Sequence, residues 1–79
     1  MRDDDLDREG PEPLYRQLAE RLAEQIESGT LRPGRPIPSE LRLCDQYGIS
    51  RDTARKAVRV LRDAGLVISV KGKGTYVSR

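Results

Sequence analysis

The chain has 79 residues, of which 35% are hydrophobic and 4% are aromatic. A chain of this length forms one domain and buries only ~60% of the surface that its unfolded form exposes, so we expect a small core and no large enclosed substrate pocket. The single cysteine, Cys44, excludes an internal disulfide, and with no His in the chain a zinc site lacks ligands.

Charge is distributed unevenly along the chain. The formal net charge is +2, but residues 50–79 hold eight Lys and Arg against two acids, whereas residues 14–49 hold five of each. A local basic excess of this kind is expected of a surface that meets a polyanion. No apolar run approaches the ~18 residues of a membrane span. Because the acidic N-terminus is the reverse of a signal peptide's basic start, we expect a cytoplasmic protein.

The first residues of the chain, MRDDDLDREGPE, are charged and contain Pro and Gly but few apolar side chains. Such a segment cannot offset the entropy of ordering. We therefore predict a flexible acidic tail over residues 1–12 and a folded domain over residues 13–79. Two roles stay open for this tail. It is either a solubilising leader or an acidic cluster that competes with nucleic acid for the basic surface.

Residues 14–28 are predicted to form a first helix, because apolar side chains recur at every fourth position. This stripe consists of Leu14, Leu18, Leu22 and Ile26. Residues 30–38 contain three prolines and a glycine, which exclude a helix and favour an extended turn. The helix is interpreted as scaffold, and the turn is expected to reverse the chain with Leu31 and Ile37 pointing inward.

A short second helix is predicted over residues 39–48. Ser39 is suited to cap its start, and Gly48 is suited to end it. The side chains expected to face the core are Leu41, Cys44 and Tyr47. Cys44 is interpreted as a packing residue, with redox sensing as the alternative.

The segment 50–64 is predicted to form a third helix with an apolar inner side and a cationic outer side. The inner side gathers Ala54, Ala57, Val58, Leu61 and Ala64, and the outer side gathers Arg51, Arg55, Arg59 and Arg62. Ser50 can cap its start, and Gly65 is suited to the left-handed position after its end. Because the second and third helices follow each other so closely, they must cross steeply, which is the helix-turn-helix arrangement. The alternative for a basic side by itself is a solvated surface.

The last part of the chain is predicted to form a β-hairpin, because LVISV and TYV are β-branched runs separated by KGKG. A hairpin directly after a helix-turn-helix forms a wing, here residues 70–75. Lys71 and Lys73 lie at its tip, and Gly72 and Gly74 let the backbone approach a groove closely. The predicted fold class is therefore α+β: a winged helix-turn-helix, with three helices followed by a two-stranded β-hairpin wing.

Three strings in order resemble the N-terminal DNA-binding domain of the GntR family of bacterial transcription regulators, in its HutC-type branch. The strings are PLYRQLAERLAEQIESGTLRPGRPIPSE at 13–40, YGISRDTARKAVRVLRDAGL at 47–66 and GKGTYV at 72–77. The resemblance implies sequence-specific binding of double-stranded DNA, with the recognition helix 50–64 in the major groove and the wing at the adjacent minor groove or backbone.

The resemblance also implies partners. Family members bind a near-palindromic operator as homodimers. They normally carry a C-terminal effector-binding domain that supplies dimerisation and releases DNA when a ligand binds, and the parent of this chain is expected to be a repressor. The chain ends two residues after Val77. This favours an excised domain over a naturally minimal protein, and such a domain is expected to be a monomer that binds half-sites weakly near the nucleoid.

Roles for individual residues follow from the resemblance together with side-chain chemistry. Arg51 and Arg55 are expected to face base edges, and bidentate hydrogen bonds to guanine suit one of them. Asp52 either accepts from a cytosine amino group or favours the helix N-terminus and orients a neighbouring Arg. Ser50 and Thr53 suit a phosphate. The complete predicted set of DNA-contacting residues is Ser39, Arg42, Ser50, Arg51, Asp52, Thr53, Arg55, Lys56, Lys71, Gly72, Lys73 and Gly74.

The sequence departs from the family pattern after the Glu of PSE, where the family commonly has Arg and this chain has Leu41. Arg42 lies ~100° further around the helix, so it cannot take over that place and is assigned a phosphate contact. The alternative function is a protein-interaction winged helix that uses its basic surface on an acidic partner. An enzyme is not expected, because the chain has no His, no nucleophile paired with a base and no GxGxxG. No cofactor and no metal are expected.

Overall fold

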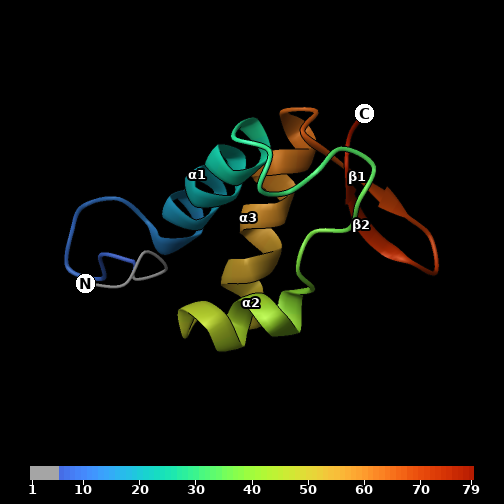
Figure 1. Ribbon diagram of the computed structural model, residues 1–79. Helices are drawn as coiled ribbons and strands as arrows, with labels where there is room; N and C mark the ends of the chain where they lie inside the picture. Colours follow the sequence, from blue (N-terminus) through green and yellow to red (C-terminus); the bar gives the residue numbers. More distant parts are fainter. Residues whose placement is uncertain (1–5) are drawn as a thin grey trace.

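The structure is a computed structural model and describes residues 6–79. These residues form three helices followed by one antiparallel hairpin, which stands to one side of the helices (Figure 1). The elements in chain order are α1 (Leu14–Glu27), α2 (Glu40–Tyr47), α3 (Arg51–Asp63), β1 (Val67–Val70) and β2 (Gly74–Val77). This order confirms the predicted fold class, a winged helix-turn-helix.

Local chemistry explains where α2 and α3 begin and end. The hydroxyls of Ser39 and Ser50 each accept a hydrogen bond of 3.1 Å from the backbone N–H three residues further on. Both side chains therefore satisfy a donor that the first helical turn leaves free. After the helices, Gly48 (φ 65°) and Gly65 (φ 78°) adopt left-handed conformations, which favour glycine. The predicted caps and terminators are confirmed.

The core lies where α1 and α2 pack against α3. Ala54 and Ala57 have no exposed surface, so small side chains let the neighbouring helices approach α3 closely. The other buried apolar side chains are Leu18, Ala19, Leu22, Ile37, Leu43, Tyr47, Ile49, Val58, Leu61, Val67 and Val77. The predicted inner side of α3 is confirmed except for Ala64. That residue is exposed because it forms the C-cap, after the last turn that packs on the core.

The orientation of α2 differs from the prediction. Leu43 is fully buried, whereas Leu41 is 61% exposed. Leu41 therefore does not face the core, and that prediction was wrong. Leu43 and Tyr47 are one helical turn apart and pack together on α3, and Leu41 lies ~200° from Leu43 around the helix. Cys44 lies between these two sides and is half-buried.

The extended segment 30–38 lies along β2 and anchors the wing to the helices (Figure 1). Pro36 forms an isolated antiparallel bridge with Tyr76. The backbone N–H of Ile37 donates to the carbonyl of Thr75 at 2.9 Å, and that of Val77 donates to the carbonyl of Arg35 at 2.8 Å. The edge of β2 that does not pair with β1 is thereby covered from Thr75 to Val77.

The start of the described chain makes specific contacts with the helices. The amide of Gln17 donates to the carbonyl oxygens of Asp7 and Glu12, and its oxygen accepts from the backbone N–H of Asp7. The guanidinium of Arg8 donates to the carbonyls of Tyr47 (2.8 Å) and Gly48 (2.7 Å) at the end of α2. The flexible tail over 1–12 stays a prediction, and its residues 1–5 lie outside the described residues.

Within residues 6–79, none of the helices combines the length and the apolar character that crossing a membrane requires.

Candidate nucleic-acid interface

The outer side of α3 carries a row of cationic side chains. We call it the basic face of α3, and it consists of Arg51, Arg55, Lys56, Arg59 and Arg62. All of these residues are exposed, while the opposite side of the helix is buried against α1 and α2. Because apolar residues bury one side of α3 in the core, the cationic side chains on the other side extend into solvent. The basic face is thus fixed by the packing of α3.

The side chains at the start of α3 that were predicted to contact DNA also interact with one another and with the helix. The hydroxyl oxygens of Ser50 and Thr53 lie 2.9 Å apart, and Ser50 also caps the helix. Asp52 lies in the first turn, where its negative charge interacts favourably with the partial positive charge of the helix N-terminus. Hydroxyls and backbone N–H groups at such an end suit a phosphate oxygen.

Among residues 6–79, two ion pairs involve cations of the basic face, and Glu40 is the half-buried partner in one of them. The guanidinium of Arg51 lies 3.9 Å from the carboxylate of Glu40 on α2, and the ammonium of Lys56 lies 3.4 Å from that of Asp52. Ion pairs with this exposure contribute about 0–1 kcal/mol. A polyanion can therefore replace either carboxylate at little cost. In the described structure Asp52 pairs with a lysine, one helical turn away, instead of a neighbouring arginine.

The tip of the wing exposes Lys71 and Lys73 on a tight turn. The backbone N–H of Lys73 donates to the carbonyl of Val70 at 3.0 Å and closes the turn. Gly72 (φ 79°) and Gly74 (φ 126°) have left-handed backbones, and a Cβ added at either would meet nothing within 4 Å. The glycines are thus required by the shape of the turn, and the open space around them leaves the backbone accessible.

A groove of ≈350 Å³ lies between the start of α2, α3 and the wing. We call it the wing groove, and it is lined by Pro36, Ile37, Pro38, Ser39, Glu40, Leu41, Arg51, Val58, Lys73, Gly74 and Thr75. It brings together four of the predicted residues, which come from three separate elements: Ser39, Arg51, Lys73 and Gly74. The other predicted residues do not line it. They are Arg42 on α2, Ser50, Asp52, Thr53, Arg55 and Lys56 at the start of α3, and Lys71 and Gly72 at the wing tip.

Sequence reasoning missed two side chains next to this surface. Glu40 pairs with Arg51, and its position in the string PSE, at the start of a helix, was the available signal. Arg8 contacts the carbonyls at the end of α2, two residues before Ser50. Because Arg8 and Gly48 are 40 positions apart in the chain, no local pattern indicates that contact.

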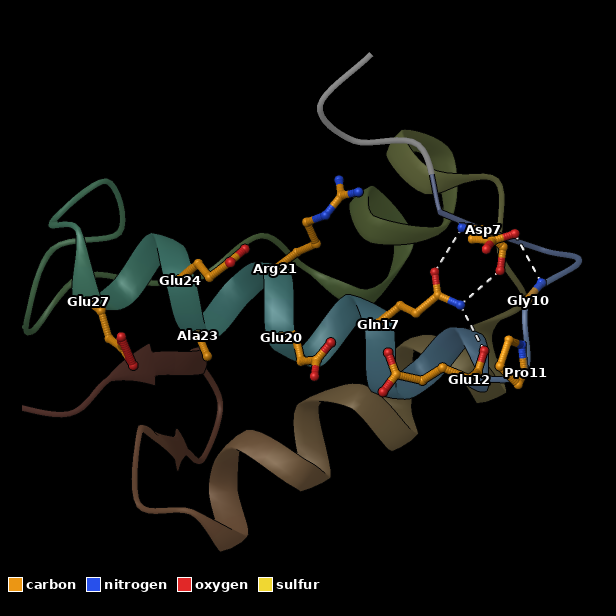
Figure 2. Close-up of a pocket in the computed structure, with 10 residues that line it drawn as sticks. All are labelled: Asp7, Gly10, Pro11, Glu12, Gln17, Glu20, Arg21, Ala23, Glu24 and Glu27. Atoms are coloured by element: carbon orange, nitrogen blue, oxygen red, sulfur yellow. Dashed lines mark hydrogen bonds between the residues drawn. The ribbon is translucent and has the colours of Figure 1, made fainter. Parts of the chain in front are cut away.

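A second, larger groove of ≈620 Å³ is formed by α1 and residues 7–12 alone (Figure 2). We call it the acidic groove, because five carboxylate side chains line it against one arginine. They are those of Asp7, Glu12, Glu20, Glu24 and Glu27. In Figure 2 the carboxylates of Glu20 and Glu27 extend from α1 on the side away from Arg21. An acidic lining repels phosphate, so volume alone does not identify the nucleic-acid interface, and charge favours the wing groove.

Comparison with known proteins identifies relatives. The family model described as "Bacterial regulatory proteins, gntR family" matches residues 14–77. The HTH-type transcriptional repressor NagR of Bacillus subtilis is 43% identical over 74 residues, which are 94% of this chain and 30% of that protein. The histidine utilization repressor of Klebsiella aerogenes is 42% identical over 71 residues, which are 90% of this chain and 30% of that protein. The chain therefore spans less than a third of the curated relatives it matches.

Solved structures agree with the fold. The crystal structure of the DNA-binding domain of AraR in complex with operator ORX1 superposes with a TM-score of 0.86 at 39% identity, and the match covers 94% of both chains. YtrA from Sulfolobus acidocaldarius, a GntR-family transcription factor, gives a TM-score of 0.85 at 32% identity and covers 94% of this chain and 63% of that one. The resemblance stated from the sequence is confirmed, including relatives of the HutC type.

Proposed function

Because the chain belongs to the gntR family of bacterial regulatory proteins, we propose that it is the DNA-binding part of a transcription repressor and binds a specific double-stranded sequence. One observation carries the proposal: a capped helix presents a basic face beside a wing with exposed lysines, and the two share one groove. The matched relatives are transcription regulators, so we assign the chain no catalytic activity.

In the proposed complex, α3 enters the major groove, which is wide enough for an α-helix. Arg51 and Arg55 lie near the N-terminus of α3, the end that this arrangement directs at base edges. Each can form paired hydrogen bonds with O6 and N7 of guanine. Ser50 and Thr53 contact a phosphate, and the wing lysines lie at the adjacent minor groove or backbone. In this arrangement α3 recognises the base sequence, and the wing fixes the position of the domain on the DNA backbone.

The operator is proposed to be near-palindromic and to bind two copies of the parent protein. The relatives are more than three times as long as the matched segment, which leaves room for an effector-binding domain that pairs two subunits. The 79-residue chain alone is proposed to be a monomer that binds half-sites weakly. In the cell the parent protein acts in the cytoplasm, at the nucleoid.

Selection of bound duplexes from a random pool tests the proposal. We expect enrichment of one short motif, and weaker binding of that motif by about 1–3 kcal/mol after Arg51→Ala or Arg55→Ala, together with relaxed choice at one base pair. Arg16→Ala is the matched control, because Arg16 is an exposed arginine on α1 that packs over Tyr15. It is expected to bind as the unchanged chain does.

Two outcomes would contradict the proposal. If the selection yields no motif, the chain does not read sequence. If the chain binds no duplex at low salt but binds an acidic protein, the basic face serves a protein partner. Equal weakening on every sequence would instead reassign the mutated arginine to a phosphate contact.

A further inference from the structure

Two large hydrophobic side chains are exposed among the residues that the structure describes, Leu41 at 61% and Ile68 at 52%. Single exposed apolar residues are common on protein surfaces. The position of Leu41 is distinctive, because it lines the wing groove together with Arg51 and Lys73. Ile68 does not line that groove. An apolar side chain thus lies among the cations of the proposed DNA-binding surface.

The backbone fixes Leu41 in that place. It is the second residue of α2, directly after Glu40, which pairs with Arg51. Ser39 caps the helix, and Leu43 and Tyr47 hold its other side in the core. Leu41 therefore cannot turn inward without pulling Leu43 out of the core. Its exposed side chain lines the wing groove together with Arg51, at the start of α3.

The ligand that covers Leu41 in the wing groove is expected to be an apolar group carried by a polyanion. Arg51 and Lys73 line the same groove and favour phosphate nearby, and the carboxylate of Glu40 in that groove already pairs with Arg51. A leucine, however, gains free energy only when an apolar surface covers it. On duplex DNA, the C5-methyl group of thymine is the apolar feature that projects from a base edge into the major groove. This group lies in the same groove as the bases that Arg51 is proposed to read.

We infer that Leu41 is a specificity-determining residue that contacts the C5-methyl group of one thymine in each half-site. The inference rests on the proposed function. It adds a thymine contact to the base contacts proposed for Arg51 and Arg55. The contact differs from those of the basic face because it discriminates thymine through packing and carries no charge. It also makes α2, in addition to α3, a part of the reading surface.

Replacement of thymine by deoxyuracil tests this contact, because it removes the methyl group and leaves base pairing intact. In the selected duplex, each thymine is replaced in turn, and the dissociation constant is measured for the unchanged chain, Leu41→Ala, Leu41→Met and Ile68→Ala. At one thymine we expect the unchanged chain to lose affinity about fourfold, the equivalent of one buried methyl-sized group. Leu41→Ala should bind both duplexes equally, whereas Leu41→Met should keep the response.

Ile68→Ala is the matched control. Ile68 pairs with Tyr76 across the hairpin, so the two side chains lie on the same face. Thr75, which lines the wing groove, is next to Tyr76 and therefore points to the opposite face. This variant should respond to deoxyuracil as the unchanged chain does. Since Leu41 and Ile68 are exposed, both variants are expected to fold, and thermal unfolding verifies this.

The results separate this inference from the proposed function. If the unchanged chain prefers its motif but Leu41→Ala responds to every deoxyuracil as the unchanged chain does, the thymine contact is refuted and the proposed function stands. Weakening of Leu41→Ala on all sequences alike would place Leu41 against the sugar backbone, which also refutes it. If no motif is selected, the proposed function itself fails.

Discussion

Arg51 connects three parts of the molecule at the level of a single side chain. It lies in the first turn of α3, pairs with Glu40 of α2 and lines the wing groove with Lys73. The pair is long, at 3.9 Å, and the arginine side chain is 62% exposed. A long pair with a largely exposed arginine orients the guanidinium without holding it tightly. Under the proposed function, Arg51 is therefore pre-positioned for a base edge while it stays free to exchange partners.

The opposite exposure of Leu41 and Leu43 gives a prediction about stability. Leu43→Ala removes a side chain with no exposed surface, so the free energy of unfolding should fall by about 2–5 kcal/mol. Leu41→Ala should change it by less than about 0.5 kcal/mol, because Leu41 is mostly in solvent. Urea denaturation of the two variants measures both values. Equal losses would show that α2 does not have the orientation described above.

Among the elements, those with local signals could be predicted and those held by distant contacts could not. Ser50 and Gly65 delimit α3 by chemistry that involves only neighbouring residues, so its bounds were correct within one residue. The orientation of α2 was wrong because its eight residues allow two apolar stripes, and packing on α3 selects the one with Leu43. The bridge between Pro36 and Tyr76 joins segments 40 positions apart, which no pattern in the sequence indicates.

The contact of Arg8 with the end of α2 predicts an effect on the turn before α3. Arg8→Ala removes two hydrogen bonds to the carbonyls of Tyr47 and Gly48, and the free energy of unfolding should fall by about 0.5–1.5 kcal/mol. Amide resonances of Gly48 and Ile49 should shift, while those of the wing stay in place. Glu9→Gln, a change at the neighbouring exposed residue, is the control. Unchanged resonances at the turn would mean that Arg8 does not hold it in solution.

At the scale of the whole molecule, charge is separated between two surfaces. The acidic groove runs along α1, while the basic face of α3 and the wing carry the cationic excess of residues 50–79. The molecule measures 34 × 25 × 20 Å. One helical turn of DNA is about 34–36 Å long, which is compatible with the proposal that one copy covers one half-site. Under the proposed function, such an asymmetric charge distribution orients the domain on DNA before any base is read.

This charge separation predicts how salt acts on binding. Lys73→Ala should weaken binding to all duplexes alike and reduce the slope of log affinity against log salt by about 1, because one phosphate contact is lost. Arg16→Ala, on α1, should leave the slope unchanged. Titrations at several salt concentrations, on the selected and on a random duplex, give both slopes. An unchanged slope for Lys73→Ala would remove the wing from the DNA interface.

The most direct test of the account is to follow backbone amide resonances while the selected duplex is added to the chain. We predict that the largest shifts fall in residues 39–42, 50–56 and 71–74, and that amides along the acidic groove of α1 move little. Shifts concentrated on α1, with residues 50–56 and 71–74 unmoved, would contradict the claim that α3 and the wing form the DNA-binding surface.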